Sequence, residues 1–188
     1  KRQHVDMRIL VFILGICLMP ACLAQPTSTA PDPELRKLLI SAVASSDSFE
    51  HPFDAEVWLM DMSERLKPYM DDARDRLYFL KLVHAEARRA ELDPELVMAV
   101  IHVESRFDRF AISVAGAQGY MQVMPFWLDE IGQTNSNLFN ASTNLRMGCT
   151  ILRYYIDMEN GNLFRALGRY NGSLGKAKYP DLVFKALR

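Results

Sequence analysis

Cysteine is scarce in this chain, with three residues in 188, so disulfide bonds cannot shape its fold. Cys17 and Cys22 lie in an apolar N-terminal segment, which leaves Cys149 alone in the remainder. Cys149 falls on the apolar face of a predicted helix, where a lone thiol packs as a small apolar side chain. No neighbouring base in the sequence would activate it as a nucleophile, so we predict a buried, unreactive thiol.

The chain also lacks an excess of either charge. It has 22 Lys and Arg against 23 Asp and Glu, a formal net charge of -1 at pH 7. Binding to nucleic acid usually requires a basic surface that neutralises phosphates. We therefore expect no nucleic-acid partner. Hydrophobic residues make up 49% of the chain, enough for one sizeable core.

Motifs for metals and nucleotides are absent as well. No histidine stands at ligand spacing from another His or Cys; the four are His4, His51, His84 and His102. No Rossmann or P-loop glycine pattern occurs, because the clustered glycines do not follow predicted strands. The sequence therefore predicts no cofactor and no metal site, and it disfavours a redox or nucleotide enzyme.

Residues 1–24 have the order of residues that is typical of a secretory signal peptide, with a few residues upstream of it. Arg8 precedes the apolar run 9–19, and small residues follow up to a cleavage site after Ala24. The run is shorter than the about 20 apolar residues that cross a membrane. We expect export to the periplasm or cell envelope. A cut before Cys22 would instead leave a lipid-modified terminus and a membrane tether, but the preceding residues match a lipoprotein signal poorly.

Three segments follow the signal peptide. Residues 25–33 are rich in Pro, Thr and Ser and are expected to form a flexible linker. Residues 34–74 are expected to form a helical N-terminal extension to the rest of the chain. Apolar residues at helical spacing predict helices over 34–44, 54–67, 72–90, 121–130, 143–158, 163–170 and 180–187, besides one that opens at residues 92–95. The predicted N-caps are Ser142 for the helix 143–158 and Asn162 for the helix 163–170. No strand of any length is evident, so we predict an all-α fold.

Glu104 interrupts the apolar face of the helix that opens at residues 92–95. Asp93 is the predicted N-cap and Pro94 the first helical residue. The apolar face then continues through Val97, Val100 and Ile101, and Glu104 takes the next position on it. Burial would raise the pKa of this carboxyl, as a general acid near neutral pH requires. The alternative is a side chain at the helix end that turns into solvent, and the pattern alone leaves both open.

Polar and aromatic side chains follow Glu104 along the chain. A Gly-rich loop over residues 105–119 leads to Gln122, and Tyr170-Asn171 closes a later helix. Amides and hydroxyls bind sugar groups and aromatic rings cover sugar faces, so this set suits a polyhydroxylated ligand. For Tyr170, simple packing on its own helix face is an equal alternative.

Four blocks of sequence stand in a fixed order within residues 75–188. They are ESRF at 104–107 followed by AIS at 111–113, GAQGYMQVMP at 116–125, NLRMG at 144–148, and ALGRYNG at 166–172. Together they resemble the signature of the soluble lytic transglycosylase (SLT) domain family. Two positions depart from the family pattern: Tyr120 replaces a common Leu, and the segment after Asn171 lacks a usual Ala.

The resemblance implies a lysozyme-like, mostly helical catalytic domain over residues 75–188 that acts on peptidoglycan glycan strands. We expect the chain to be a monomer. In this family, one glutamic acid protonates the β-1,4 bond between N-acetylmuramic acid and N-acetylglucosamine. It then takes the proton of the muramoyl C6 hydroxyl, which gives a 1,6-anhydro product. Glu104 stands at that position. The resemblance also assigns substrate-binding residues: Ser113, Gln122 and Met124 should line the groove, and Tyr170, followed by Asn171, should hydrogen-bond near the acid.

Two alternative functions follow from the same residues. A lysozyme-type hydrolase would ordinarily use a second carboxylate across the scissile bond. The nearby candidates are Asp108, Asp129 and Glu130, each of which we interpret as a surface charge. A non-catalytic peptidoglycan-binding module could keep the groove without the reaction. The role of residues 25–74 is not covered by the resemblance.

Overall fold

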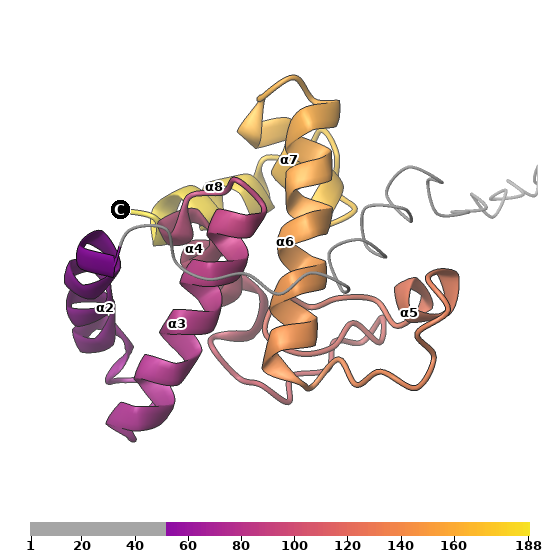
Figure 1. Ribbon diagram of the computed structural model, residues 1–188. Helices are drawn as coiled ribbons and strands as arrows, with labels where there is room; N and C mark the ends of the chain where they lie inside the picture. Colours follow the sequence, from indigo (N-terminus) through magenta and orange to yellow (C-terminus); the bar gives the residue numbers. More distant parts are fainter. Residues whose placement is uncertain (1–51) are drawn as a thin grey trace, which may run out of the picture. The chain divides into compact units, whose positions relative to one another are not determined.

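The computed structural model describes the backbone of residues 52–188 and the side chains from Trp58 onward. These residues form seven α-helices and no strand longer than an isolated bridge (Figure 1). The helices are α2 Pro52–Leu66, α3 Ala73–Arg89, α4 Pro94–Ser105, α5 Phe126–Glu130, α6 Ala141–Met158, α7 Leu163–Tyr170 and α8 Lys178–Ala186. The all-α prediction is confirmed for this part of the chain. The predicted signal peptide, linker and helix 34–44 lie outside the described residues.

Local capping residues begin most of these helices. Asp93 accepts a hydrogen bond from the backbone N–H of Glu95 at 2.8 Å, and Pro94 follows as the first helical residue, as predicted. Asn162 caps α7 in the same way, also as predicted. The predicted cap of α6 is wrong. Asn140, not Ser142, accepts from the N–H of Thr143 at 3.1 Å, because both residue types cap helices equally well and the helix begins two residues earlier.

The predicted helix 121–130 is also wrong in its first half, since only α5 forms. Gln118 and Val123 exchange backbone hydrogen bonds of 2.9 and 3.0 Å, so this stretch pairs with itself as a tight hairpin. Gln122 at the turn has a φ of 50°, in the left-handed region that a right-handed helix cannot accommodate. Long-range pairing therefore overrides the local helical spacing.

The core is centred on α4, which contacts both α3 and α8 (Figure 1). A helix that is apolar on most of its circumference must be buried on most sides. Most residues of α4 are buried. Its fully buried residues are Val97, Val100 and Ile101. Residue Cys149 of α6 is also fully buried and its pKa is raised by burial, which confirms the predicted buried thiol. No helix in the described part of the chain is both long and apolar enough to span a bilayer.

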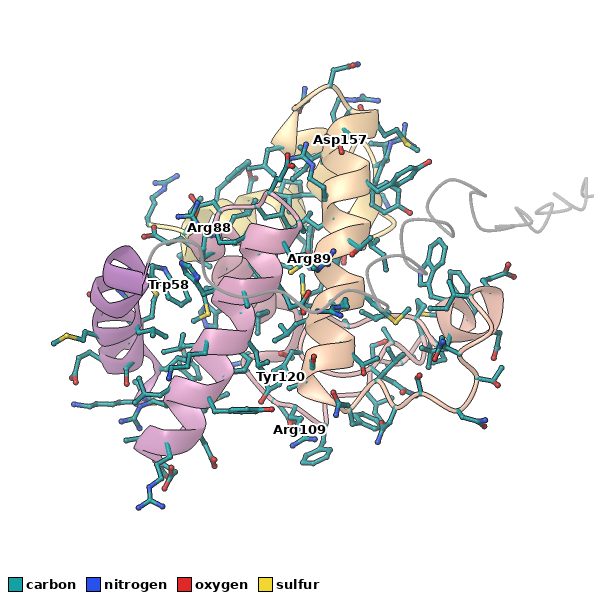
Figure 2. The ribbon with its side chains drawn as sticks, in the orientation of Figure 1. Trp58, Arg88, Arg89, Arg109, Tyr120 and Asp157 are labelled. Atoms are coloured by element: carbon teal, nitrogen blue, oxygen red, sulfur yellow. The ribbon has the colours of Figure 1, made fainter. Side chains whose placement is uncertain are left out.

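A buried ion-pair cluster ties α3 to α6. Glu86 is 4% exposed, and its carboxylate lies 2.6 Å from Arg89 Nε and 2.7 Å from an Arg146 nitrogen. Arg89 also donates to the Thr150 hydroxyl at 2.8 Å, and Figure 2 shows its side chain between the two helices. A buried carboxylate needs such partners, since its desolvation is costly. The cluster fixes how α6 lies against α3.

The loop between α4 and α5 is attached to α6 by one amide side chain. Asn144 is fully buried. Its Oδ1 accepts from the backbone N–H of Met121 at 2.8 Å, and its Nδ2 donates to the carbonyl of Gln118 at 2.8 Å. Buried backbone groups require such partners. Asn144 thus adds a side-chain link to the backbone bridge that already pairs Gln118 with Ile112.

Candidate active site

Glu104 lies in the last turn of α4 with its carboxyl group half-buried. The Tyr179 hydroxyl, from the first turn of α8, donates a hydrogen bond of 2.6 Å to its Oε1. Tyr179 is itself 7% exposed, so the pair lies where α4 and α8 pack together. The Glu104 side chain therefore does not turn out into solvent, the alternative that the sequence had left open.

Burial makes the Glu104 carboxyl a weaker acid than an ordinary glutamic acid. It raises the pKa of this carboxyl from 4.5 to about 7, although the hydrogen bond from Tyr179 acts in the opposite direction. Burial and the nearby Glu104 charge also raise the pKa of Tyr179 and of Tyr170, so both phenols are neutral donors. A carboxyl with this pKa exchanges its proton readily at neutral pH, as an acid that later acts as a base must.

Tyr170 lies near the acid but does not hydrogen-bond to it. Its hydroxyl donates to the carbonyl of Met121 at 2.8 Å, which connects α7 to the loop before α5. The tyrosine that holds Glu104 is Tyr179, which the sequence reasoning missed. Tyr179 and Val183 are buried on one face of α8, and a buried tyrosine hydroxyl usually needs a partner. That signal could have singled out Tyr179, but not its partner 75 residues away.

The other predicted binding residues lie in or beside the same loop, where their polar groups hold its backbone. Gln122 Nε2 donates to the carbonyls of Ala111 and Gly119 at 3.1 and 3.0 Å. Ser113 Oγ accepts from the N–H of Ala117 at 3.0 Å. Both side chains are half-buried, and so is Met124, which packs against the core. Their role in binding substrate stays a prediction.

Asn171 lies at the exposed end of α7. Its Nδ2 donates to the Ser173 hydroxyl at 2.9 Å, so the amide shapes the turn that follows the helix. Like that of the loop residues, its contact with substrate stays a prediction.

None of the three candidate second carboxylates is built into a site. Asp108 is exposed and accepts from the N–H of Phe110 at 2.8 Å, and Asp129 is exposed on α5. Both are surface charges, as predicted, whereas Glu130 is half-buried and engaged in contacts. Within residues 52–188, no three His, Cys, Asp or Glu side chains gather as they would around a metal ion.

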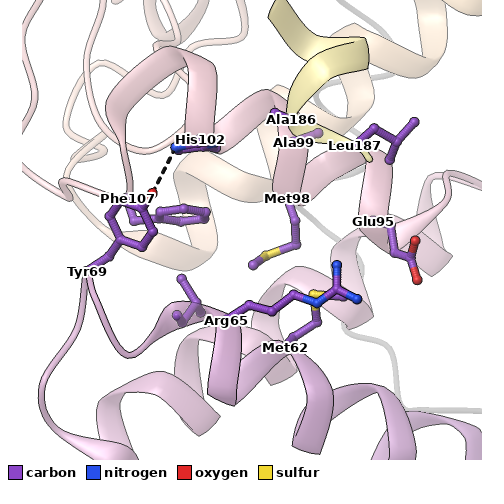
Figure 3. Close-up of a pocket in the computed structure, with 11 residues that line it drawn as sticks. Met62, Arg65, Tyr69, Glu95, Met98, Ala99, His102, Phe107, Ala186 and Leu187 are labelled. Atoms are coloured by element: carbon purple, nitrogen blue, oxygen red, sulfur yellow. Dashed lines mark hydrogen bonds between the residues drawn. The ribbon is translucent and has the colours of Figure 1, made fainter.

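A separate pocket of about 140 Å³ lies on another side of α4, between α2 and the end of α8 (Figure 3). Glu104 does not line it. His102 does, together with residues that include Tyr69, Phe107, Met98 and Leu187. His102 therefore points away from the acid, as its position two residues before Glu104 in a helix predicts.

Comparison with known proteins gives the family. The model of the transglycosylase SLT domain family matches residues 81–180, just over half of the chain. The chain belongs to this family.

Several relatives can be aligned over part of their length. A transglycosylase of Enterobacteria phage PRD1 is 31% identical over 116 residues, which cover 58% of this chain and 43% of the phage protein. Membrane-bound lytic murein transglycosylase C of Mannheimia succiniciproducens is 34% identical over 113 residues, 52% of this chain and 32% of that protein. Membrane-bound lytic murein transglycosylase F of Desulfosudis oleivorans is 32% identical over 113 residues, 57% and 24% of the two chains. The chain thus spans less than half the length of these curated relatives.

One solved structure is also similar. It is an inactive mutant of the lytic transglycosylase Slt from Pseudomonas aeruginosa, with 24% identity and a TM-score of 0.46. The match covers 72% of this chain and 25% of the other.

Proposed function

We propose that this chain is a lytic transglycosylase that cleaves the β-1,4 bond between N-acetylmuramic acid and N-acetylglucosamine in peptidoglycan. The observation that carries the proposal is the half-buried Glu104 carboxyl, with its pKa raised to about 7 and its Oε1 held by Tyr179. Membership of the SLT domain family and the names of the relatives support the substrate.

In the proposed reaction, the Glu104 carboxyl first loses a proton and then gains one. Protonated Glu104 donates its proton to the glycosidic oxygen, and the bond between that oxygen and C1 of the muramoyl residue breaks. The resulting carboxylate takes the proton from the C6 hydroxyl of the same sugar. The C6 oxygen then bonds to C1, which closes the 1,6-anhydro ring and restores protonated Glu104. No water is consumed, and no second carboxylate is required.

Tyr179 has two effects on this cycle. Its hydrogen bond occupies Oε1, and no hydrogen bond among the described residues reaches Oε2, so Oε2 is the oxygen that we assign to the substrate. The same bond stabilises the carboxylate between the two proton transfers, because hydrogen bonds to charged groups are stronger than neutral ones. Tyr179 therefore orients the acid and limits the rise of its pKa.

Removing that hydroxyl should shift the pH dependence. In Tyr179→Phe the influence that lowers the Glu104 pKa is lost, so this pKa should rise above about 7. Because the first step needs protonated Glu104, the alkaline limb of the rate profile should move to higher pH. We also expect kcat to fall by about tenfold, since the carboxylate loses a donor. The measurement is kcat against pH on soluble glycan oligomers. An alkaline limb that stays in place, or moves to lower pH, would contradict the assigned role.

Location and partners are part of the proposal. Two of the relatives are named membrane-bound murein transglycosylases, which supports work on glycan strands in the cell envelope. We propose an exported monomer, tethered to a membrane only if Cys22 carries lipid.

Mass analysis of digestion products tests the function directly. Purified sacculi incubated with the protein should release muropeptides with anhydro ends, each one water lighter than the hydrolysed form. Reducing ends that carry an added water would make the protein a hydrolase of lysozyme type. Intact sacculi that retain bound protein would make it a binding module.

A further inference from the structure

Three aromatic rings, from Tyr69, His102 and Phe107, form a ring cluster in the wall of the pocket in Figure 3. The Tyr69 hydroxyl lies 3.0 Å from Nε2 of His102, and the two ring centres are 5.4 Å apart. The Tyr69 and Phe107 centres are 5.0 Å apart. His102 and Phe107 stack nearly parallel, at 5.6 Å and 11°. Each ring therefore contacts the other two.

The cluster joins the N-terminal extension to the helix that carries Glu104. Tyr69 lies in the connection between α2 and α3, outside the residues 81–180 that match the family. This connection is held firmly: the buried Arg76 guanidinium donates to the carbonyls of Met70 and Asp71 at 2.6 and 2.8 Å. The position of Tyr69 is thus fixed, and its ring contacts His102 and Phe107 at the end of α4.

The end of α4 needs such support. Arg106 and Phe107 have φ angles of 51° and 65°, in the left-handed region that non-glycine residues adopt at a cost in free energy. Two such residues in succession persist only where the surroundings hold them. Phe107 is held by the other two rings of the cluster, and by Phe79, whose ring centre lies 6.2 Å away. Glu104 is in the helical turn directly before this pair, so its position depends on where the helix ends.

We propose that Tyr69 is a positioning residue for Glu104, through the ring contacts that fix the left-handed turn after α4. The inference rests on the proposed function for its activity readout. His102 lines a pocket that Glu104 does not reach, so Tyr69 acts through the backbone of α4 rather than by touching the acid. The extension would then belong to the catalytic unit although the family match does not include it.

Variants of Tyr69 test the proposal in the full chain. Tyr69→Ala should lower kcat on soluble glycan oligomers about tenfold and leave KM within about twofold, because orientation is lost rather than binding. It should also lower the Glu104 pKa, read by NMR titration of carboxyl-labelled protein, because a loosened helix end admits water to the carboxyl. Tyr69→Phe keeps the ring and should fall between wild type and Tyr69→Ala. The matched control is Tyr78→Ala, at an exposed position on α3, which should change neither reading.

The outcomes separate this inference from the proposed function. A Tyr69→Ala protein that melts at a lower temperature but keeps both kcat and the Glu104 titration would show that Tyr69 only stabilises the extension. That result overturns the inference. The NMR titration needs no substrate, so it still decides the role of Tyr69 if wild-type protein releases no anhydro products, an outcome that overturns the proposed function alone.

Discussion

Glu104→Gln should lower the release of soluble products from sacculi by about 1,000-fold or more, because it removes the only proton donor of the proposed reaction. The amide has the shape of the carboxyl and can still accept from the Tyr179 hydroxyl, so the fold should be kept. The measurement is the initial rate of product release at neutral pH. The matched control is Glu95→Gln, at an exposed position on the same helix, which should retain wild-type activity.

Unchanged sacculus turnover by the Glu104→Gln protein would contradict the proposed function. Together with retained binding to sacculi, it would favour the alternative of a non-catalytic peptidoglycan-binding module. A loss of activity in Glu95→Gln as well would point to a general defect of α4 instead of a specific role of the acid.

The same substitution should make the folded state more stable at high pH. The pKa of Glu104 is higher in the folded protein than the ordinary 4.5, so the folded state binds the proton more tightly than the unfolded state does. Wild-type stability should therefore fall as pH rises from about 4.5 to about 7. Glutamine carries no charge and avoids this loss, roughly 2–3 kcal/mol at pH 8. Urea unfolding of both proteins at pH 4 and pH 8 measures the difference, which should be small at pH 4.

Gly119→Ala is expected to destabilise the fold by about 3–5 kcal/mol. Gly119 has a φ of 75°, and an added Cβ would lie 2.4 Å from Asn144 Nδ2 and 2.6 Å from the carbonyl oxygen of Leu138. Neither neighbour can move freely, because Asn144 is fully buried and the second contact is with backbone. Thermal or urea unfolding measures the loss.

Gly132→Ala is the matched control for Gly119→Ala. Gly132 has a similar φ of 70°, but an added Cβ would meet nothing within 4 Å. The free energy of unfolding of Gly132→Ala should fall by only about 1–2 kcal/mol, the cost of the left-handed conformation for alanine. Equal losses in the two variants would show that backbone strain, and not the contact with Asn144, determines the effect at Gly119.

Features that depend on neighbouring residues could be predicted from the sequence. Asp93 and Pro94 begin α4, and the apolar spacing after them places Glu104 on a face that is largely buried. These relations span one or two helical turns, where geometry follows directly from spacing. The resemblance to the SLT family, confirmed by the family match, added a chemistry that spacing alone does not specify.

Features that depend on distant residues could not be predicted in this way. The bond between Tyr179 and Glu104 joins positions far apart in the chain, and nothing near either residue indicates the other. Residues 121–125 have helical spacing, yet the pairing of Gln118 with Val123 and the Asn144 amide hold them in another conformation. Such contacts form only when separate segments pack together, so local propensity gives way to them.

The attachment of the loop to α6 by Asn144 affects how that loop can open. The amide hydrogen of Met121 is bonded to a fully buried side chain of α6, the longest described helix, so it is released only when the hairpin and α6 separate. We therefore expect the amide hydrogen of Met121 to exchange with solvent more slowly than those of exposed turns. The segment that carries Gln122 and Met124 should therefore open only together with the loss of its contact to α6.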